Sequence, residues 1–129
     1  MNTDRIIGIA ENNGWSASIE DKTNKRIIFE FSKMTPAGQD FSFNVEMTEN
    51  EYSNFIENVE ECYQAYDPDY EASQWIGKDG HGQHGAPYHI KDLVEDMIAA
   101  KDMIWNLLSE FKDKTTEVFN IVNNSFNNK

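Results

Sequence analysis

The chain of 129 residues has one cysteine, Cys62, and no apolar run long enough to cross a membrane. A single cysteine excludes an intramolecular disulfide, so packing has to hold the fold together. A membrane-spanning helix needs roughly eighteen apolar residues in succession, and the polar residues 2–5 do not begin a signal peptide. We therefore expect a cytoplasmic protein without contact to a membrane.

Basic residues are absent from the middle third of the sequence. Residues 34–77 contain ten acidic residues and no lysine or arginine, whereas residues 1–33 carry no net charge. Most of the formal net charge of −12 is therefore concentrated in this stretch. Such a charge opposes direct binding of nucleic acid, and it is typical of a protein that binds a basic partner or only needs solubility.

The longest regular pattern is helical and covers residues 89–111, where apolar side chains recur every three or four positions. Three earlier segments alternate between apolar and polar residues, which is the pattern of a strand with one wet face. These strands are predicted over residues 15–20, 27–31 and 41–47. The short connections between them predict an antiparallel meander.

Shorter helical patterns lie on both sides of the predicted strands. Residues 3–12 predict a helix that precedes the first strand. Thr48 and Glu51 have the spacing of a capping box, which predicts that a helix begins at residue 49 and runs to about Tyr66.

Asp67 and Pro68 predict a third short helix, which ends near Gly77. The order of elements is then helix, three strands and three helices, with the long helix last. This is an α+β fold, in which a three-stranded antiparallel meander packs against helices. We expect one domain over residues 1–122 and a frayed, Asn-rich tail over residues 123–129.

The apolar stripe of the long helix is wider than one small sheet would cover. Part of it keeps the four-three alternation of a coiled-coil seam, which predicts a homodimer through this helix. The predicted seam consists of Leu93, Met97, Ala100, Ile104, Leu107 and Phe111.

Three motifs that could indicate chemistry have ordinary explanations. The glycines at positions 80, 82 and 85 match a dinucleotide-binding spacing, but no strand precedes them and a proline separates them from the next helix. The histidines at 81, 84 and 89 could bind a metal with Asp79 or Cys62 as a fourth ligand, but glycine-rich loops are flexible and the spaced cysteines of a structural zinc site are missing. Cys62 has no basic neighbour in sequence to lower its pKa. We expect no catalytic residue, metal or cofactor, and therefore no enzyme.

The acidic residues of the middle third are the feature that points most directly to a function. Glu57, Glu60 and Glu61 are neighbours on one helical face, and like charges at this spacing repel by a few tenths of a kcal/mol per pair. The predicted partner-binding face consists of Glu49, Glu51, Glu57, Glu60, Glu61, Asp67, Asp69 and Glu71.

Two functions agree with this face. In the first, the chain binds a basic protein surface, and its carboxylates imitate nucleic acid to block a nucleic-acid-binding partner. In the second, the chain is a small accessory or structural domain, and its acidic face only provides solubility.

Four segments resemble a family of small acidic proteins from gut bacteria and their mobile elements. They are residues 35–43 (TPAGQDFSF), 75–76 (WI), 85–87 (GAP) and 90–96 (IKDLVED). The resemblance covers about half of the chain and implies a mobile-element setting, but no activity and no functional residues. The predicted architecture and charge also resemble small anti-CRISPR proteins that fill the DNA-reading groove of a Cas nuclease. The order of elements is similar to double-stranded-RNA-binding domains as well, but Asp92, Glu95 and Asp96 make the long helix acidic, which opposes RNA binding.

Overall fold

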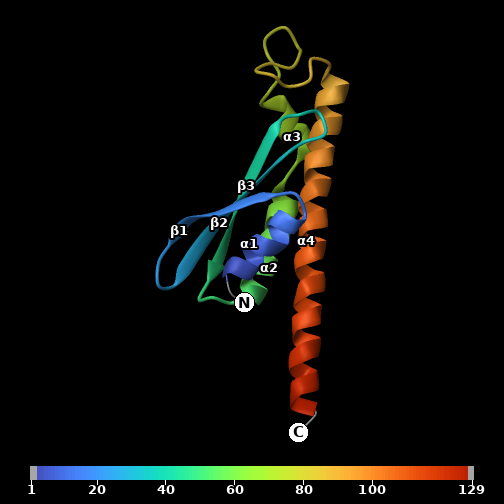
Figure 1. The fold of residues 1–129 in the computed structure, drawn as a ribbon. Helices are drawn as coiled ribbons and strands as arrows, with labels where there is room; N and C mark the ends of the chain where they lie inside the picture. Colours follow the sequence, from blue (N-terminus) through green and yellow to red (C-terminus); the bar gives the residue numbers. More distant parts are fainter. Residues whose placement is uncertain (1–2, 128–129) are drawn as a thin grey trace.

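The computed structural model describes residues 3–127, and the side chains of residues 3–114. The elements follow one another as α1 (Thr3–Asn12), β1 (Ser16–Lys22), β2 (Arg26–Met34), β3 (Asp40–Thr48), α2 (Tyr52–Ala65), α3 (Pro68–Ser73) and α4 (Ile90–Asn127). This order confirms the predicted α+β fold with a long last helix (Figure 1).

The sheet is a three-stranded antiparallel meander in the order β1-β2-β3, as predicted. Period-two alternation places Phe29 and Phe31 of β2 on one face, where they lie opposite Val45 and Phe43 of β3. A register shift at Glu20 marks a bulge in β1. One face of the sheet is therefore apolar, and the other is lined mainly by polar side chains.

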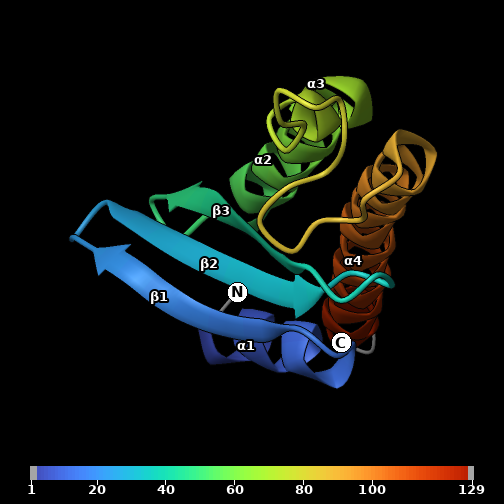
Figure 2. The ribbon, with the colours of Figure 1, turned by 90° about the horizontal axis from the view of Figure 1, so that it is seen from above.

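The helices pack against the apolar face of the sheet, and α2 also covers part of its outer edge at β3. Seen from above, α1 lies beside β1 and α2 lies beside β3, while α4 stands at one end of the strands (Figure 2). Aromatic rings fill the centre, where Phe111 of α4 lies 5.8 Å from Phe31 and 5.0 Å from Phe55 of α2, measured between ring centroids. Fully burying one such ring contributes about 1.5–3 kcal/mol, so these contacts dominate the core.

The residues predicted to form a dimer seam belong to this core. All six are buried within the single chain, with exposed fractions between 0 and 7 %. Their assignment to a surface between two copies is wrong, because other elements of the same chain cover these six side chains, whereas Ile90, Ile98 and Trp105 of the same helix are exposed. A homodimer stays a prediction without an assigned surface.

A smaller apolar cluster attaches α3 to the first turns of α4. Ala72 of α3 packs there against Leu93 and Met97. Asp67 caps α3 as predicted, since its carboxylate accepts hydrogen bonds from the backbone N–H groups of Asp69 and Tyr70. The helix ends at Ser73 and not near Gly77, so the chain leaves it one turn earlier than predicted.

The predicted capping box at the start of α2 does not form. Glu49 and Asn50 have positive φ angles of 53° and 57°, and α2 begins after Glu51, whose side chain makes no capping hydrogen bond. The N–H of Thr48 is instead satisfied by the Asn54 side chain, which accepts from it at 2.7 Å. Thr48 is therefore the last residue of β3 and does not cap α2.

The last helix runs from Ile90 to Asn127, so its backbone includes residues 123–127 of the predicted tail. Residues 128–129 and the side chains after residue 114 lie outside the described part, and fraying of the tail stays a prediction. Among the described residues, no helix has the combination of length and hydrophobicity that crossing a membrane requires.

Candidate interaction surface

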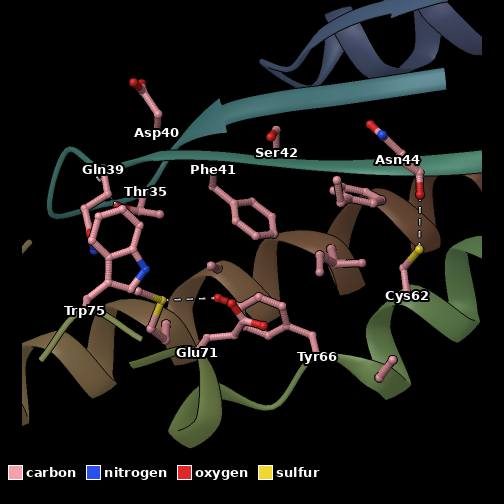
Figure 3. Close-up of a pocket in the computed structure, with 15 residues that line it drawn as sticks. Thr35, Gln39, Asp40, Phe41, Ser42, Asn44, Cys62, Tyr66, Glu71 and Trp75 are labelled. Atoms are coloured by element: carbon pink, nitrogen blue, oxygen red, sulfur yellow. Dashed lines mark hydrogen bonds between the residues drawn. The ribbon is translucent and has the colours of Figure 1, made fainter. Parts of the chain in front are cut away.

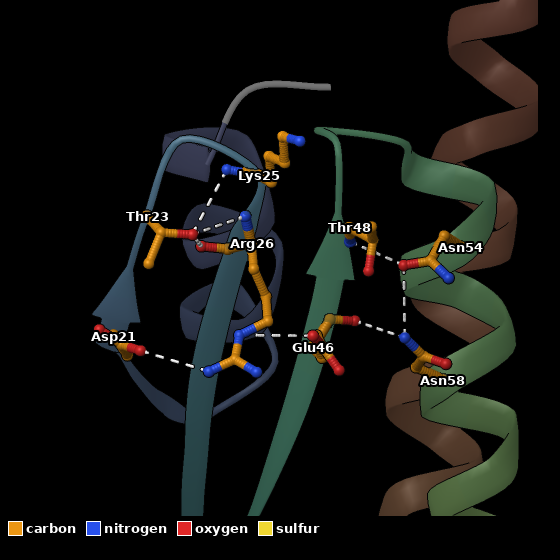
Figure 4. A network of polar contacts seen from close by, with 8 residues as sticks. All are labelled: Asp21, Thr23, Lys25, Arg26, Glu46, Thr48, Asn54 and Asn58. Carbon is orange, nitrogen blue, oxygen red and sulfur yellow. Dashed lines mark hydrogen bonds and ion pairs between the residues drawn. The ribbon is translucent and has the colours of Figure 1, made fainter.

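Side chains of α2 cover the second half of the outer edge of β3. Three of them follow one another at successive turns of the helix and bond to backbone groups that β2 does not use; Figure 4 shows the first two and Figure 3 the third. The bonds join Asn54 Oδ1 to the Thr48 N–H at 2.7 Å, the Asn58 Nδ2–H to the Glu46 carbonyl at 2.7 Å, and the Cys62 Sγ–H to the Asn44 carbonyl at 3.5 Å. An unpaired strand edge attracts other strands, and these bonds protect half of it.

Arg26 neutralises acids on the wet face of the sheet near this edge. Its guanidinium lies 3.5 Å from Asp21 of β1 and 3.4 Å from Glu46 of β3 (Figure 4). Exposed pairs of this kind contribute at most about 1 kcal/mol. Their main consequence is that Glu46 is already paired and does not belong to the unpaired acidic surface.

Over the first half of β3, the edge borders a cleft of about 510 Å³ between β3, α2, α3 and α4. Phe41 points into this cleft, and Tyr66 and Trp75 form its opposite side, whereas the side chains of Asp40 and Ser42 point away from it (Figure 3). The rings of Phe41 and Tyr66 meet edge to face with centroids 5.6 Å apart. The cleft is therefore an aromatic groove that runs along a strand edge.

The charged residues that line the cleft are all acidic. They are Asp40 from β3 and Glu71 from α3, and no lysine, arginine or histidine is among the described lining residues. Glu71 belongs to the predicted acidic face, so this face and the cleft meet at α3.

Tyr66 lines the cleft opposite Phe41, and both its hydroxyl and its backbone carbonyl are hydrogen-bonded. Its hydroxyl donates to the sulfur of Met97 at 3.3 Å, and its carbonyl accepts from the Lys101 Nζ at 2.9 Å. Burial, together with the charges of Glu71 and Asp96, raises the pKa of Tyr66 to about 12. The phenol is therefore neutral at physiological pH and presents an apolar ring to the cleft.

Cys62 is a half-buried residue of α2 beside the outer edge of β3. Burial raises the pKa of its thiol, and the charge of Glu61 adds to this effect. A nucleophilic cysteine needs the opposite shift.

Asp96 ties the β2–β3 loop to α4 at the end of the cleft. Its carboxylate is 5 % exposed and accepts from the Thr35 hydroxyl at 2.6 Å, the Ala37 N–H at 3.0 Å and the Gln39 side-chain amide at 2.6 Å. Two of the segments that carry the resemblance, the β2–β3 loop and the start of α4, meet at this carboxylate.

The sequence predicted only that Asp96, with Asp92 and Glu95, makes the long helix acidic, and the burial of Asp96 was not predicted. The signal was present in the sequence, because Asp96 falls on the apolar stripe between Leu93 and Ala100. An acid on the buried side of a helix needs hydrogen-bond donors, and the polar loop supplies them.

The predicted acidic face lies along α2, its preceding turn and α3. Glu49, Glu51, Glu57, Glu61, Asp67 and Asp69 are exposed, and Glu60 and Glu71 are half-buried. Within the described part of the chain, Glu60 is the one member of this set with an ion pair, to Lys112 of α4 at 3.7 Å.

The glycine-rich loop between α3 and α4 folds on itself. Gly77 donates to the His81 carbonyl and Gly82 to the Tyr88 carbonyl, both at 2.9 Å, and a side chain at Gly82 would collide with the carbonyl oxygen of Pro87. Close backbone packing thus explains Gly82. His81 stacks on Tyr88 with centroids 4.0 Å apart. In the region that the structure describes, no three His, Cys, Asp or Glu side chains are placed to hold a metal ion.

Comparison of the chain with protein families, with curated proteins and with solved structures gives no match. The resemblances to small acidic proteins of gut bacteria and to anti-CRISPR proteins therefore stay predictions. What the chain can bind has to be inferred from its own surface.

Proposed function

We propose that this chain is a non-enzymatic interaction protein, whose acidic surface on α2 and α3 binds a basic surface of another protein. The observation that supports it is the stretch of residues 34–77, which folds into β3, α2 and α3 without contributing one lysine or arginine. Seven of the eight predicted acids keep their charge without an ion pair among the described residues.

The arrangement costs stability, which favours a role beyond solubility. Glu57 and Glu61 are exposed one turn apart on α2, where like charges repel by a few tenths of a kcal/mol. Solubility requires net charge, but it does not require that charge to be concentrated in one stretch that folds into β3, α2 and α3. A basic partner would convert this repulsion into attraction and would accelerate association.

In its more specific form, the proposal is that the partner is a nucleic-acid-binding protein and that the chain imitates its ligand. The fourteen residues of α2 span about 20 Å, and duplex DNA presents one negative charge per about 1.7 Å. The carboxylates of α2 and α3 are sparser than phosphates but have the same sign and lie on or next to two helices.

Reversal of Glu57, Glu60 and Glu61 to lysine tests the proposal. Partners are captured at low salt from the native host with the wild-type chain, identified, purified and titrated over a range of salt. We expect the triple variant to bind at least about tenfold more weakly, with a smaller salt dependence. The matched control reverses Glu95, Asp102 and Asp113, three exposed acids of α4, and changes the net charge equally.

Equal binding by both variants and the wild-type chain would refute the acidic surface as the binding site. Duplex DNA is then added to the complex with the partner. Release of the chain supports the nucleic-acid mimic, whereas simultaneous binding of DNA and chain refutes the mimic and leaves the basic partner in place.

A further inference from the structure

The first half of β3 presents outward backbone groups to which no described residue outside the sheet donates or accepts a hydrogen bond. In an antiparallel strand, the N–H and C=O of one residue point to the same side, and the side alternates along the chain. Groups of Asn44, Glu46 and Thr48 face α2, so those of Asp40 and Ser42 also face away from β2. We call the outward backbone groups of Asp40 and Ser42 the free edge, and no hydrogen bond reaches them from the described residues.

The covering of the edge ends where α2 ends. Side chains from successive turns of α2 bond to β3 as far as Asn44. One more turn of the helix would reach Ser42. However, α2 ends at Ala65, and the chain turns away at Tyr66. The space left beside Ser42 is the cleft (Figure 3). The free edge and the cleft therefore form one site, with backbone groups along one side and aromatic side chains below.

An added strand would fit this site in a defined way. Alternate side chains of a strand point to opposite faces. One set would enter the cleft beside Phe41, Tyr66 and Trp75, and the other set would lie beside the Asp40 side chain on the wet face. Backbone hydrogen bonds would provide affinity, and the aromatic groove would provide selectivity for apolar side chains.

We propose that the free edge and the cleft bind an extended segment of the partner protein as a fourth strand, with apolar side chains alternating with lysine or arginine. The basic character follows from charge complementarity, because Glu71 lines the cleft, the Asp40 side chain lies on the wet face beside the free edge, and the neighbouring α2 and α3 are acidic. The inference rests on the proposed function in one respect, that the partner is basic. A second copy of this chain, with a net charge of −12, is a poor occupant.

The test uses a dye-labelled, end-capped nine-residue peptide in which lysine and valine alternate, and fluorescence anisotropy with the full chain. Ser42→Pro removes an outward N–H that β2 does not use, and proline is tolerated at strand edges for this reason. Ser42→Ala removes the same hydroxyl and keeps the N–H. We expect Ser42→Pro to raise the Kd of the peptide about tenfold or more and Ser42→Ala to leave it within about twofold.

Backbone methylation of the peptide tests the hydrogen bonds from the other side. One peptide carries N-methyl groups on its lysine residues, and another carries them on its valine residues. Because the two sets of N–H groups point to opposite sides of a strand, only one methylated peptide should lose binding. Equal binding of both methylated peptides, or equal loss, would overturn the added strand.

The outcomes separate this inference from the proposed function. If the peptide binds the Ser42→Pro variant as well as the wild type but fails to bind the variant with Glu57, Glu60 and Glu61 reversed, the added strand is refuted and the acidic surface stands. If the wild-type chain self-associates in sedimentation and Ser42→Pro abolishes this, a second copy occupies the edge and the partner strand is refuted. Circular dichroism and urea unfolding verify that the Ser42 variants are folded.

Discussion

Replacing Asp96 by alanine should loosen the attachment of the β2–β3 loop to α4. The substitution leaves three donors without their acceptor, from Thr35, Ala37 and Gln39. Hydrogen bonds to a charged group contribute about 1.5–3 kcal/mol each, but such values do not add up within one network. Ala37 is exposed and regains water, whereas the hydroxyl of Thr35, a residue with an exposed fraction of 6 %, does not.

We therefore expect Asp96→Ala to lower the free energy of unfolding by about 2–4 kcal/mol, since the desolvation cost of the carboxylate disappears with it. For a chain of this length, the melting temperature should fall by roughly 6–15 °C. Asp96→Asn should cost about 1–2 kcal/mol, because the amide oxygen still accepts one bond and the Thr35 hydroxyl can reverse to accept another.

Urea unfolding followed by the fluorescence of the buried Trp15 measures these changes. Asp102→Ala is the control, because Asp102 is an exposed acid of the same helix and its removal should change stability by less than about 0.5 kcal/mol. Hydrogen exchange of the Ala37 N–H gives a local reading, and it should accelerate in Asp96→Ala alone. A difference below about 1 kcal/mol between Asp96→Ala and Asp102→Ala would refute the role assigned to this carboxylate.

Three further predictions follow from pKa values. The raised pKa of Tyr66, about 12, means that this residue stabilises the folded state below pH 10 and that this contribution is lost as the pH rises toward 12; ultraviolet titration should show one late phenol step, absent in Tyr66→Phe. The charge of Glu20 raises the pKa of the exposed Glu30 above 4.5. Glu30 therefore contributes to the stability of the folded state below pH 4.5, and this contribution is lost as the pH rises through the raised pKa of Glu30. In urea unfolding, Glu20→Gln should thus increase the free energy of unfolding at pH 7 but not at pH 3. An equal effect at both pH values would contradict this prediction. The raised pKa of Cys62 predicts slow alkylation by iodoacetamide at pH 8, and Glu61→Gln should accelerate it.

Local patterns predicted the strands and helices because they are set by neighbours in sequence. The alternation through Phe41, Phe43 and Val45 has one structural solution, a strand with one buried face. The start of α2 was missed because a capping box is a pattern of two residues, and Asn54 competes for the same N–H. The dimer seam was mistaken because a stripe on a helix does not reveal whether the surface that covers it belongs to the same chain.

The cleft and the free edge were beyond prediction from sequence. Phe41, Tyr66, Trp75 and Met97 come from separate segments, and only the fold brings them together. The position at which α2 turns away from β3 depends on the last turn of the helix, and helix ends are the least predictable feature of a sequence pattern. Charge alone pointed to residues 34–77, and this stretch contains β3, α2 and α3, the elements on which both proposals rest.

The central position of Phe111 has a consequence for biosynthesis. The three strands and α2 are contiguous in the chain, but the rings of Phe31 and Phe55 complete their packing against a residue that is translated more than fifty positions later. A ribosome adds about 5–20 residues per second, so the growing polypeptide carries an open aromatic surface for several seconds. During this interval the nascent chain depends on its negative charge, and on chaperones that shield apolar surfaces, to avoid aggregation.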